Sequence, residues 1–185
     1  ALAGDELTRI VKSRNVTVFD GRGTLGADHT TVNITGGASG DISITGSSII
    51  LAAGSVPRTI PGFPIDERRI VTSDEMLSIP ELPKRAVVIG GGAIGCEFAS
   101  MMADLGTTVT IIEAAPKILV NCDPDIIRVV ERNFAKRGIE IHSGVGVTGQ
   151  TTTADGVTVH FGEGQSVEAD TVVVSNPAQR AAEVA

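Results

Sequence analysis

The sequence has no tryptophan and no tyrosine, and its five phenylalanines bring the aromatic content to only 3% of 185 residues. Proteins that bind single-stranded nucleic acid stack bases on aromatic side chains, so this composition argues against them. The net charge of −7 opposes binding to a phosphate backbone. No apolar run approaches the ~20 residues of a membrane span. We therefore expect neither nucleic acid nor membrane as a partner, while an apolar content of 42% suits a globular protein.

Cysteine is also scarce, because Cys96 and Cys122 are the only two in the chain. They form neither a C-x-x-C pair nor a metal-binding spacing, so we expect no metal site. Such low cysteine usage favours a reducing compartment, either the cytoplasm or a mitochondrial matrix. Cys96 is either a thiol activated by a helix N-terminus or a small buried apolar residue. We expect the histidines to be polar strand or loop residues rather than catalytic bases; they are His29, His142 and His160.

The most informative stretch of the sequence is a glycine-rich turn between two apolar segments. Residues 86–89 are apolar and β-branched, which predicts a buried parallel strand. A G-x-G-x-x-G pattern follows directly, made of Gly90, Gly91, Gly92, Ala93, Ile94 and Gly95. Apolar residues then recur at helical spacing up to a terminating glycine, at Ile94, Phe98, Met101, Met102, Leu105 and Gly106. Residues 107–112 predict a second strand, and Glu113 stands at its end.

Each position of this turn has a physical role in binding a dinucleotide. Gly90 permits a tight turn, Gly92 lets a pyrophosphate approach the backbone, and Gly95 lets the helix lie close to the strand. The free N–H groups and the positive dipole of the first helical turn then hold the phosphates. Glu113 follows at close to the ~20-residue spacing of the acid that binds a ribose 2′-OH, and its charge favours NAD over NADP. The alternative is an ordinary βαβ unit whose glycines serve only packing.

The segments before this turn predict a small β-meander. We expect a helix over residues 5–12, followed by three short strands over 16–19, 31–35 and 42–44. Turns over 20–23 and 36–41 separate the strands. The apolar residues 48–52 predict a buried strand whose sheet this chain does not contain.

The remaining segments predict the rest of an α/β domain. A capping box at Thr72 and Glu75 opens a short helix, and Asp123 and Pro124 open a longer one whose stripe includes Ile126, Ile127, Val130 and Phe134. We expect a third parallel strand over 139–142, a second meander over 145–168, and a buried strand over 170–175. The fold class is therefore α/β, a Rossmann-like parallel sheet with β-meanders.

Two stretches, AAGSVPRTIPG and VVIGGGAIGCEFASMMADLGTTVTIIE, resemble in this order the pyridine nucleotide-disulfide oxidoreductases. The resemblance runs from about residue 5 to residue 175. It implies a partial FAD domain at 1–56, a connector at 57–84, an NAD-binding domain at 85–175 and a tail at 176–185. NAD and FAD are the implied cofactors, and the full-length enzyme is implied to be a homodimer.

The resemblance also implies a role for individual residues. The glycine turn carries the pyrophosphate role and Glu113 the ribose role, while Glu97 matches an acid beneath the flavin–nicotinamide region. Val147 matches a backbone contact to the adenosine side of NAD. The residues matched to FAD contacts are Gly23, Ala53, Gly54 and Ser55.

Several parts of the family pattern are missing from this sequence. It lacks a first G-x-G-x-x-G for FAD, the C-x-x-x-x-C redox pair and the dimerisation domain, and residues 176–180 replace a G-R-R-P stretch. Ala1 is not an initiator methionine. We therefore expect a middle fragment that binds NAD(H), taken from an enzyme that passes electrons between a dithiol, FAD and NAD. The alternatives are another FAD/NAD(P)H oxidoreductase, such as an NADH oxidase or transhydrogenase, or a non-catalytic nucleotide-binding module.

Overall fold

The computed structural model describes residues 2–56, 60–175 and 179–180. Their contacts divide the chain into two units, one made of Ala1–Ser55 with Arg180–Ala185 and the other of Val56–Gln179. The predicted connector and tail fall partly outside the described residues, at 57–59, 176–178 and 181–185.

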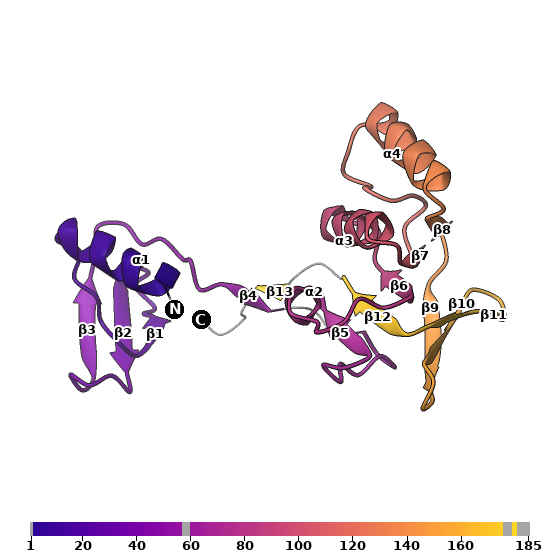
Figure 1. Ribbon diagram of the computed structural model, residues 1–185. Helices are drawn as coiled ribbons and strands as arrows, with labels where there is room; N and C mark the ends of the chain where they lie inside the picture. The colour runs from indigo at the N-terminus through magenta and orange to yellow at the C-terminus, as the bar shows by residue number, and fades with distance from the viewer. Residues whose placement is uncertain (1, 57–59, 176–178, 181–185) are drawn as a thin grey trace. The chain divides into compact units, whose positions relative to one another are not determined.

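The larger unit is built on a five-stranded parallel sheet (Figure 1). Its strands, in spatial order, are β5 (Ile70–Thr72), β12 (Thr171–Val174), β6 (Arg85–Ile89), β7 (Thr108–Glu113) and β8 (Glu140–Ser143). The predicted parallel strands are confirmed, and residues 86–89 are buried as their apolar run requires. The sequence pattern missed β5, because three residues are too few to show a period.

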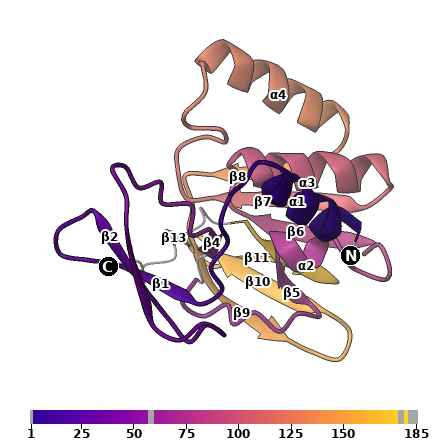
Figure 2. The ribbon, with the colours of Figure 1, turned by 90° about the vertical axis from the view of Figure 1, so that its left-hand side faces the viewer.

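Helices cover one face of this sheet and an antiparallel sheet covers the other (Figures 1 and 2). Val88 and Ile111 point to the face that packs against α3 (Ala93–Asp104) and α4 (Pro124–Lys136). Val87 and Ile112 point to the opposite face. That face is covered by β9 (Val147–Thr152), β10 (Val157–Phe161) and β11 (Gln165–Ala169), which confirm the second predicted meander. Burial on both faces explains why the parallel strands are continuously apolar.

The predicted helix ends are confirmed. Thr72 caps α2 (Ser73–Met76) in a capping box with Glu75. Asp123 caps α4 by accepting a hydrogen bond from the Asp125 amide at 2.8 Å. Glycines in the left-handed conformation follow α3 and α4, at Gly106 and Gly138.

The buried face of α3 differs from the predicted stripe. Phe98 and Met102 are buried as expected, but three predicted stripe residues are exposed, namely Ile94 (48%), Met101 (42%) and Leu105 (62%). Small residues occupy their place against the sheet, because Gly95, Cys96 and Ala99 are buried. These small side chains let the helix axis lie close to the strands, which turns the larger apolar residues outward. Ile126 on α4 is exposed as well, contrary to the predicted stripe.

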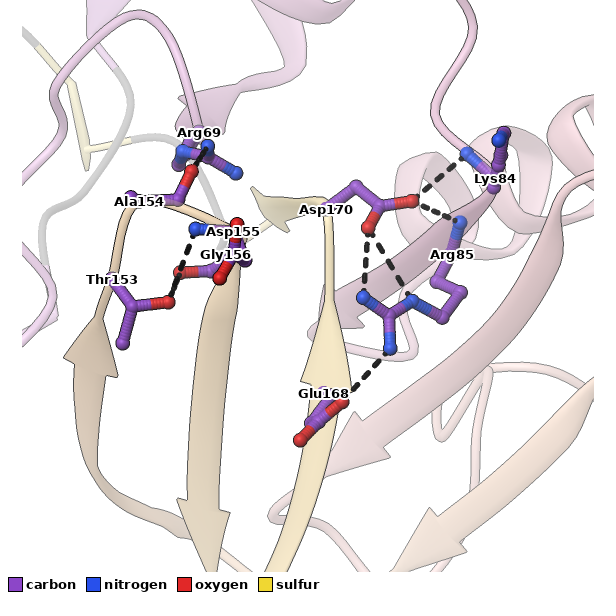
Figure 3. Close-up of polar contacts among 9 residues, drawn as sticks. All are labelled: Arg69, Lys84, Arg85, Thr153, Ala154, Asp155, Gly156, Glu168 and Asp170. Carbon is purple, nitrogen blue, oxygen red and sulfur yellow. Dashed lines mark hydrogen bonds and ion pairs between the residues drawn. The ribbon is translucent and has the colours of Figure 1, made fainter.

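A charged clamp joins the start of β6 to β12 (Figure 3). The Asp170 carboxylate accepts hydrogen bonds from the backbone amides of Lys84 and Arg85, at 3.1 and 2.9 Å, and from the Arg85 guanidinium at 2.9 Å. A second bond joins the guanidinium to Glu168 at 2.9 Å. Partial burial raises the pKa of Asp170, but the bonds from Arg85 outweigh it and hold the pKa below its ordinary value.

The smaller unit contains α1 (Leu2–Ser13) and an antiparallel sheet of β1 (Arg22–Leu25), β2 (Thr31–Thr35) and β3 (Ile42–Thr45). The predicted helix and the last two strands are confirmed. The predicted turn at 20–23 is wrong in its second half, because β1 begins at Arg22 and pairs with β2.

Two predicted strands of this unit are wrong. Residues 16–19 and 48–52 have no strand geometry, and Val18 and Ile50 are 65% and 91% exposed. An apolar run adopts a strand only when a neighbour pairs with it and covers it, and no described strand does so for either segment. Past residue 52 the chain forms β4 (Ser55–Val56), which pairs with β13 (Gln179–Arg180).

Candidate functional site

A cavity of about 580 Å³ lies at the carboxyl ends of β6 and β7. In an open α/β sheet, ligands bind at this edge of the strands. Seven of the residues singled out from the sequence line this cavity, namely Gly90, Gly91, Gly92, Ala93, Ile94, Glu113 and Val147. The structure therefore brings the glycine turn, the acid and the proposed adenosine contact into one place.

The glycines of the turn differ in what their missing side chains allow. Gly90 has a φ of +108°, which L-residues with side chains rarely adopt. A Cβ on Gly95 would lie 2.0 Å from the Gly90 carbonyl oxygen, so this glycine permits the close approach of helix and strand. A Cβ on Gly91 would lie 2.6 Å from a methyl group of Ile118. In contrast, a Cβ on Gly92 meets nothing within 4 Å, so its surroundings are open to a ligand.

The N-terminus of α3 opens into this cavity without a side-chain cap. Gly92 is the N-cap residue and offers no side-chain acceptor, and the first turn holds no acidic residue. The helix is 12 residues long, so its first-turn amides and its dipole present a partial positive charge to the cavity. A negatively charged group of a ligand satisfies such amides.

Glu113 is fixed at the edge of the same cavity. Its carboxylate accepts a hydrogen bond from the Gly91 amide at 2.5 Å and one from the Ala115 amide at 2.6 Å. An ionised carboxylate has about four acceptor positions, so two such bonds leave capacity for a hydroxyl donor. The side chain is half-buried and faces the glycine turn, which is the orientation that the sequence pattern predicts.

The sequence predicts Cys96 to be either an activated thiol or a small buried apolar residue, and the structure favours the buried residue. Its thiol is buried and lies 3.4 Å from the Gly91 carbonyl oxygen, to which it donates. Burial raises the pKa of this thiol to about 11, and the nearby Glu113 charge adds to the effect. A thiol with a raised pKa is a poor nucleophile, so the reactive-thiol interpretation is wrong.

The remaining predicted site residues lie elsewhere. Glu97 is exposed on α3 and lines a separate groove between α3 and α4. The FAD-matched residues fall in the smaller unit, where Gly23 belongs to β1 and Ala53 and Gly54 precede β4. Ser55 is the first residue of β4. Their roles stay predictions.

Sequence reasoning missed three polar residues of the cavity, Lys117, Asn121 and Ser175. Lys117 and Asn121 lie in the loop after β7, and Ser175 directly follows β12. The rule that ligands bind at the carboxyl ends of parallel strands points to these positions, since each follows such a strand. The Ser175 hydroxyl is buried without a hydrogen-bond partner among the described residues.

The sheet and its cavity define an α/β protein with an anion-accepting crevice at the carboxyl edge of parallel strands. Comparison with known families makes the class specific. The chain belongs to the pyridine nucleotide-disulphide oxidoreductase family, whose sequence profile matches residues 3–181. FAD and NAD(P) are the cofactors of this family.

Curated relatives of this chain include dihydrolipoyl dehydrogenases. The enzyme from Chlamydia muridarum is 39% identical over 173 residues, which are 92% of this chain and 36% of that protein. The mitochondrial enzyme of Pisum sativum is 38% identical over 137 residues, or 71% of this chain and 27% of that protein. The chain thus spans about a third of the length of the curated relatives it matches.

Solved structures agree with this family assignment. LpdA from Mycobacterium tuberculosis has a TM-score of 0.82 at 27% identity, covering 94% of this chain and 39% of that one. A Cu(II) complex of a C43S mutant of the flavoprotein disulfide reductase RclA from Escherichia coli has a TM-score of 0.81 at 26% identity, covering 99% and 41%. Among the helices that the structure describes, none is long and apolar enough to cross a membrane.

Proposed function

We propose that this chain is the NAD(H)-binding part of a dihydrolipoyl dehydrogenase, a homodimeric flavoenzyme that moves electrons between dihydrolipoamide, FAD and NAD. The observation that carries the proposal is the cavity in which an uncapped helix N-terminus faces a fixed carboxylate. The relatives named dihydrolipoyl dehydrogenase support the particular enzyme. They come from bacteria and a mitochondrion, which is compatible with a cytoplasmic or matrix location.

Different residues of the cavity bind different parts of NAD in this proposal. The first-turn amides of α3 hold the pyrophosphate, and the open space at Gly92 lets it approach the backbone. Glu113 accepts from the ribose hydroxyls, and its two amide donors keep it oriented toward them. Bound NAD supplies a nicotinamide ring that accepts or donates a hydride.

The same carboxylate sets the preference between NAD and NADP. A 2′-phosphate placed beside Glu113 meets a like charge, whereas a 2′-hydroxyl donates to it. Lys117 also lines the cavity, and its positive charge reduces this repulsion. The repulsion is not removed, because two backbone amides hold the Glu113 carboxylate in place beside the ribose. We therefore propose NAD as the preferred nucleotide.

The dithiol chemistry belongs to parts of the enzyme that this chain does not supply. Of the two cysteines, Cys96 is buried with a raised pKa and Cys122 is exposed, and the described residues hold no disulfide between them. Electron exchange with dihydrolipoamide needs a redox pair of thiols. We propose that this chain alone binds NAD(H) and does not oxidise the substrate.

Titration of the purified chain with NADH and NADPH in a calorimeter tests the proposal. We expect saturable binding of NADH and weaker binding of NADPH. AMP is the control for the adenosine half, and it should compete with NADH. A chain that is folded by circular dichroism but binds neither dinucleotide would overturn the proposal.

A further inference from the structure

We infer that Ser175 is a hydrogen-bonding contact of the bound dinucleotide, on the side of the glycine turn opposite to Glu113. The inference rests on the proposed NAD(H) binding and adds a specific residue to it. Ser175 is only 8% exposed, and its hydroxyl has no hydrogen-bond partner among the described residues. It nevertheless lines the cavity that holds the glycine turn.

A buried hydroxyl without a partner is unfavourable, because it loses its hydrogen bonds to water on folding and gains none. Native proteins pair most of such groups, so each exception calls for an explanation. The backbone amide of this residue has a partner, since it donates to the Ile89 carbonyl at 2.8 Å. The hydroxyl has none among the described residues, which is expected of a group that a ligand completes.

The position of the hydroxyl places it at the base of the glycine turn. Its oxygen lies 3.3 Å from the point that a Cβ on Gly95 would occupy, and the same point lies 2.0 Å from the Gly90 carbonyl. Rotation about the Cα–Cβ bond of Ser175 moves the oxygen between staggered positions. Since the residue lines the cavity, a rotation that turns the oxygen toward the cavity would place it against a ligand there.

The order of the strands decides which half of the dinucleotide Ser175 meets. Ser175 follows β12 and Glu113 ends β7, and the two strands flank β6 on opposite sides. Neighbouring strands are ~4.8 Å apart, so the two ends are separated by roughly 10 Å. With the adenosine ribose at Glu113 and the pyrophosphate at the turn, Ser175 lies toward the nicotinamide half.

The test replaces Ser175 and compares three ligands and the stability of the fold. We expect Ser175→Ala to weaken NADH binding about 3- to 10-fold, the loss typical of one hydrogen bond. Its affinity for AMP should equal that of the unaltered chain, because AMP lacks the nicotinamide half. ADP-ribose serves as the third ligand, and it reports whether the bond goes to the ribose side or to the nicotinamide ring. The thermal midpoint should stay equal or rise, because an unpartnered buried hydroxyl is removed.

Ser175→Cys is the second variant, because it keeps the shape of the side chain with a somewhat larger γ atom and replaces the hydroxyl with a weak donor. It should lose NADH affinity as Ser175→Ala does. Unchanged NADH affinity in both variants would overturn the inference. A parallel loss of AMP binding and thermal stability would overturn it too, because the hydroxyl would then have a structural role. If the unaltered chain binds no NADH, the proposed function itself fails, which is a different result.

Discussion

At the scale of single residues, the proposed recognition of the nucleotide depends on the glycine turn and on the acid beyond it. Their functions separate cleanly in the structure: Gly95 allows helix and strand to touch, Gly92 leaves space, and Glu113 supplies charge. Because the three residues have different surroundings, substitutions at the three positions should differ in their effects on NADH affinity and on the stability of the fold.

Replacement of Glu113 by arginine reverses the charge beside the ribose. We expect Glu113→Arg to weaken NADH binding by about 1–3 kcal/mol, the value of a hydrogen bond to a charged group, and to narrow the difference between NADH and NADPH. Titration calorimetry with both nucleotides measures the change. Since the carboxylate also holds the Gly91 and Ala115 amides, the thermal midpoint must be recorded alongside. Equal affinity for NADH in variant and parent would remove Glu113 from the site.

Two alanine substitutions at the glycine turn form a matched pair. In Gly95→Ala the new Cβ meets the Gly90 carbonyl oxygen at 2.0 Å, so we expect a loss of about 1–3 kcal/mol in the free energy of unfolding. In Gly92→Ala the Cβ meets nothing within 4 Å and φ is −72°, so stability should change by less than about 1 kcal/mol. NADH binding should fall nonetheless, because the methyl group occupies the space of the phosphates. Denaturant unfolding and NADH titration of both variants check the pair, and wild-type NADH affinity in Gly92→Ala would contradict it.

At the scale of elements, the parallel sheet of the larger unit is held together by polar contacts at the start of β6 and just before β12. The Asp170 carboxylate fixes the two amides at the start of β6, and Arg85 closes the same clamp from its side chain (Figure 3). This contact holds β12 and β6 in register at the edge away from the cavity. The clamp is thus a structural feature of the sheet, and none of its residues lines the cavity.

The clamp should make the stability of the chain depend on pH. The pKa of Asp170 is depressed in the folded state, so its contribution is complete above the ordinary carboxyl pKa near 4 and is lost as the pH falls through the lower folded value. We expect Asp170→Asn to cost about 1–2 kcal/mol at neutral pH, a modest figure because the side chain is partly exposed. Urea unfolding between about pH 7 and pH 2 should show the difference between variant and parent shrinking below about pH 4. A constant difference over that range would exclude the charge of Asp170 as the cause.

The sequence predicted elements well wherever the chain itself supplies their neighbours. The strand over 86–89, the capped helix at Asp123 and the second meander all pack against partners within the larger unit. Residues 16–19 and 48–52 carry equally apolar patterns but have no pairing strand among those described, so their periodicity could not decide their structure. For α3 the pattern gave the helix and its end but not its buried face, since small residues made the contact.

In the candidate site, too, the residues that a local pattern predicts differ from those that depend on neighbouring strands. The glycine turn and Glu113 are local in sequence, so a spacing rule located them. Lys117 and Ser175 line the cavity only because separate strands end at the same edge of the sheet. Locating them required the strand order, which no local pattern contains.

At the scale of the whole molecule, the two units differ in how completely their apolar residues are buried. The larger unit has apolar clusters on both faces of its parallel sheet. In the smaller unit, Ile50 is 91% and Leu51 60% exposed, in a segment that the sequence predicts to be a buried strand. The chain matches only about a third of the length of its curated relatives, so those proteins contain further residues that could cover this segment.

This difference between the units predicts that the chain binds NADH but not flavin. The larger unit contains a complete glycine turn with an uncapped helix, whereas the smaller unit offers only scattered FAD-matched residues, Gly23, Ala53, Gly54 and Ser55, and no second G-x-G-x-x-G. We expect the purified chain to be colourless and to remain so after incubation with FAD and removal of free flavin by gel filtration. NADH titration of the same sample provides the positive control, because it shows that the larger unit is folded and active in binding. A yellow protein with stoichiometric flavin would show that the smaller unit holds FAD without the second turn, and the assignment of FAD binding to the rest of the enzyme would then be wrong.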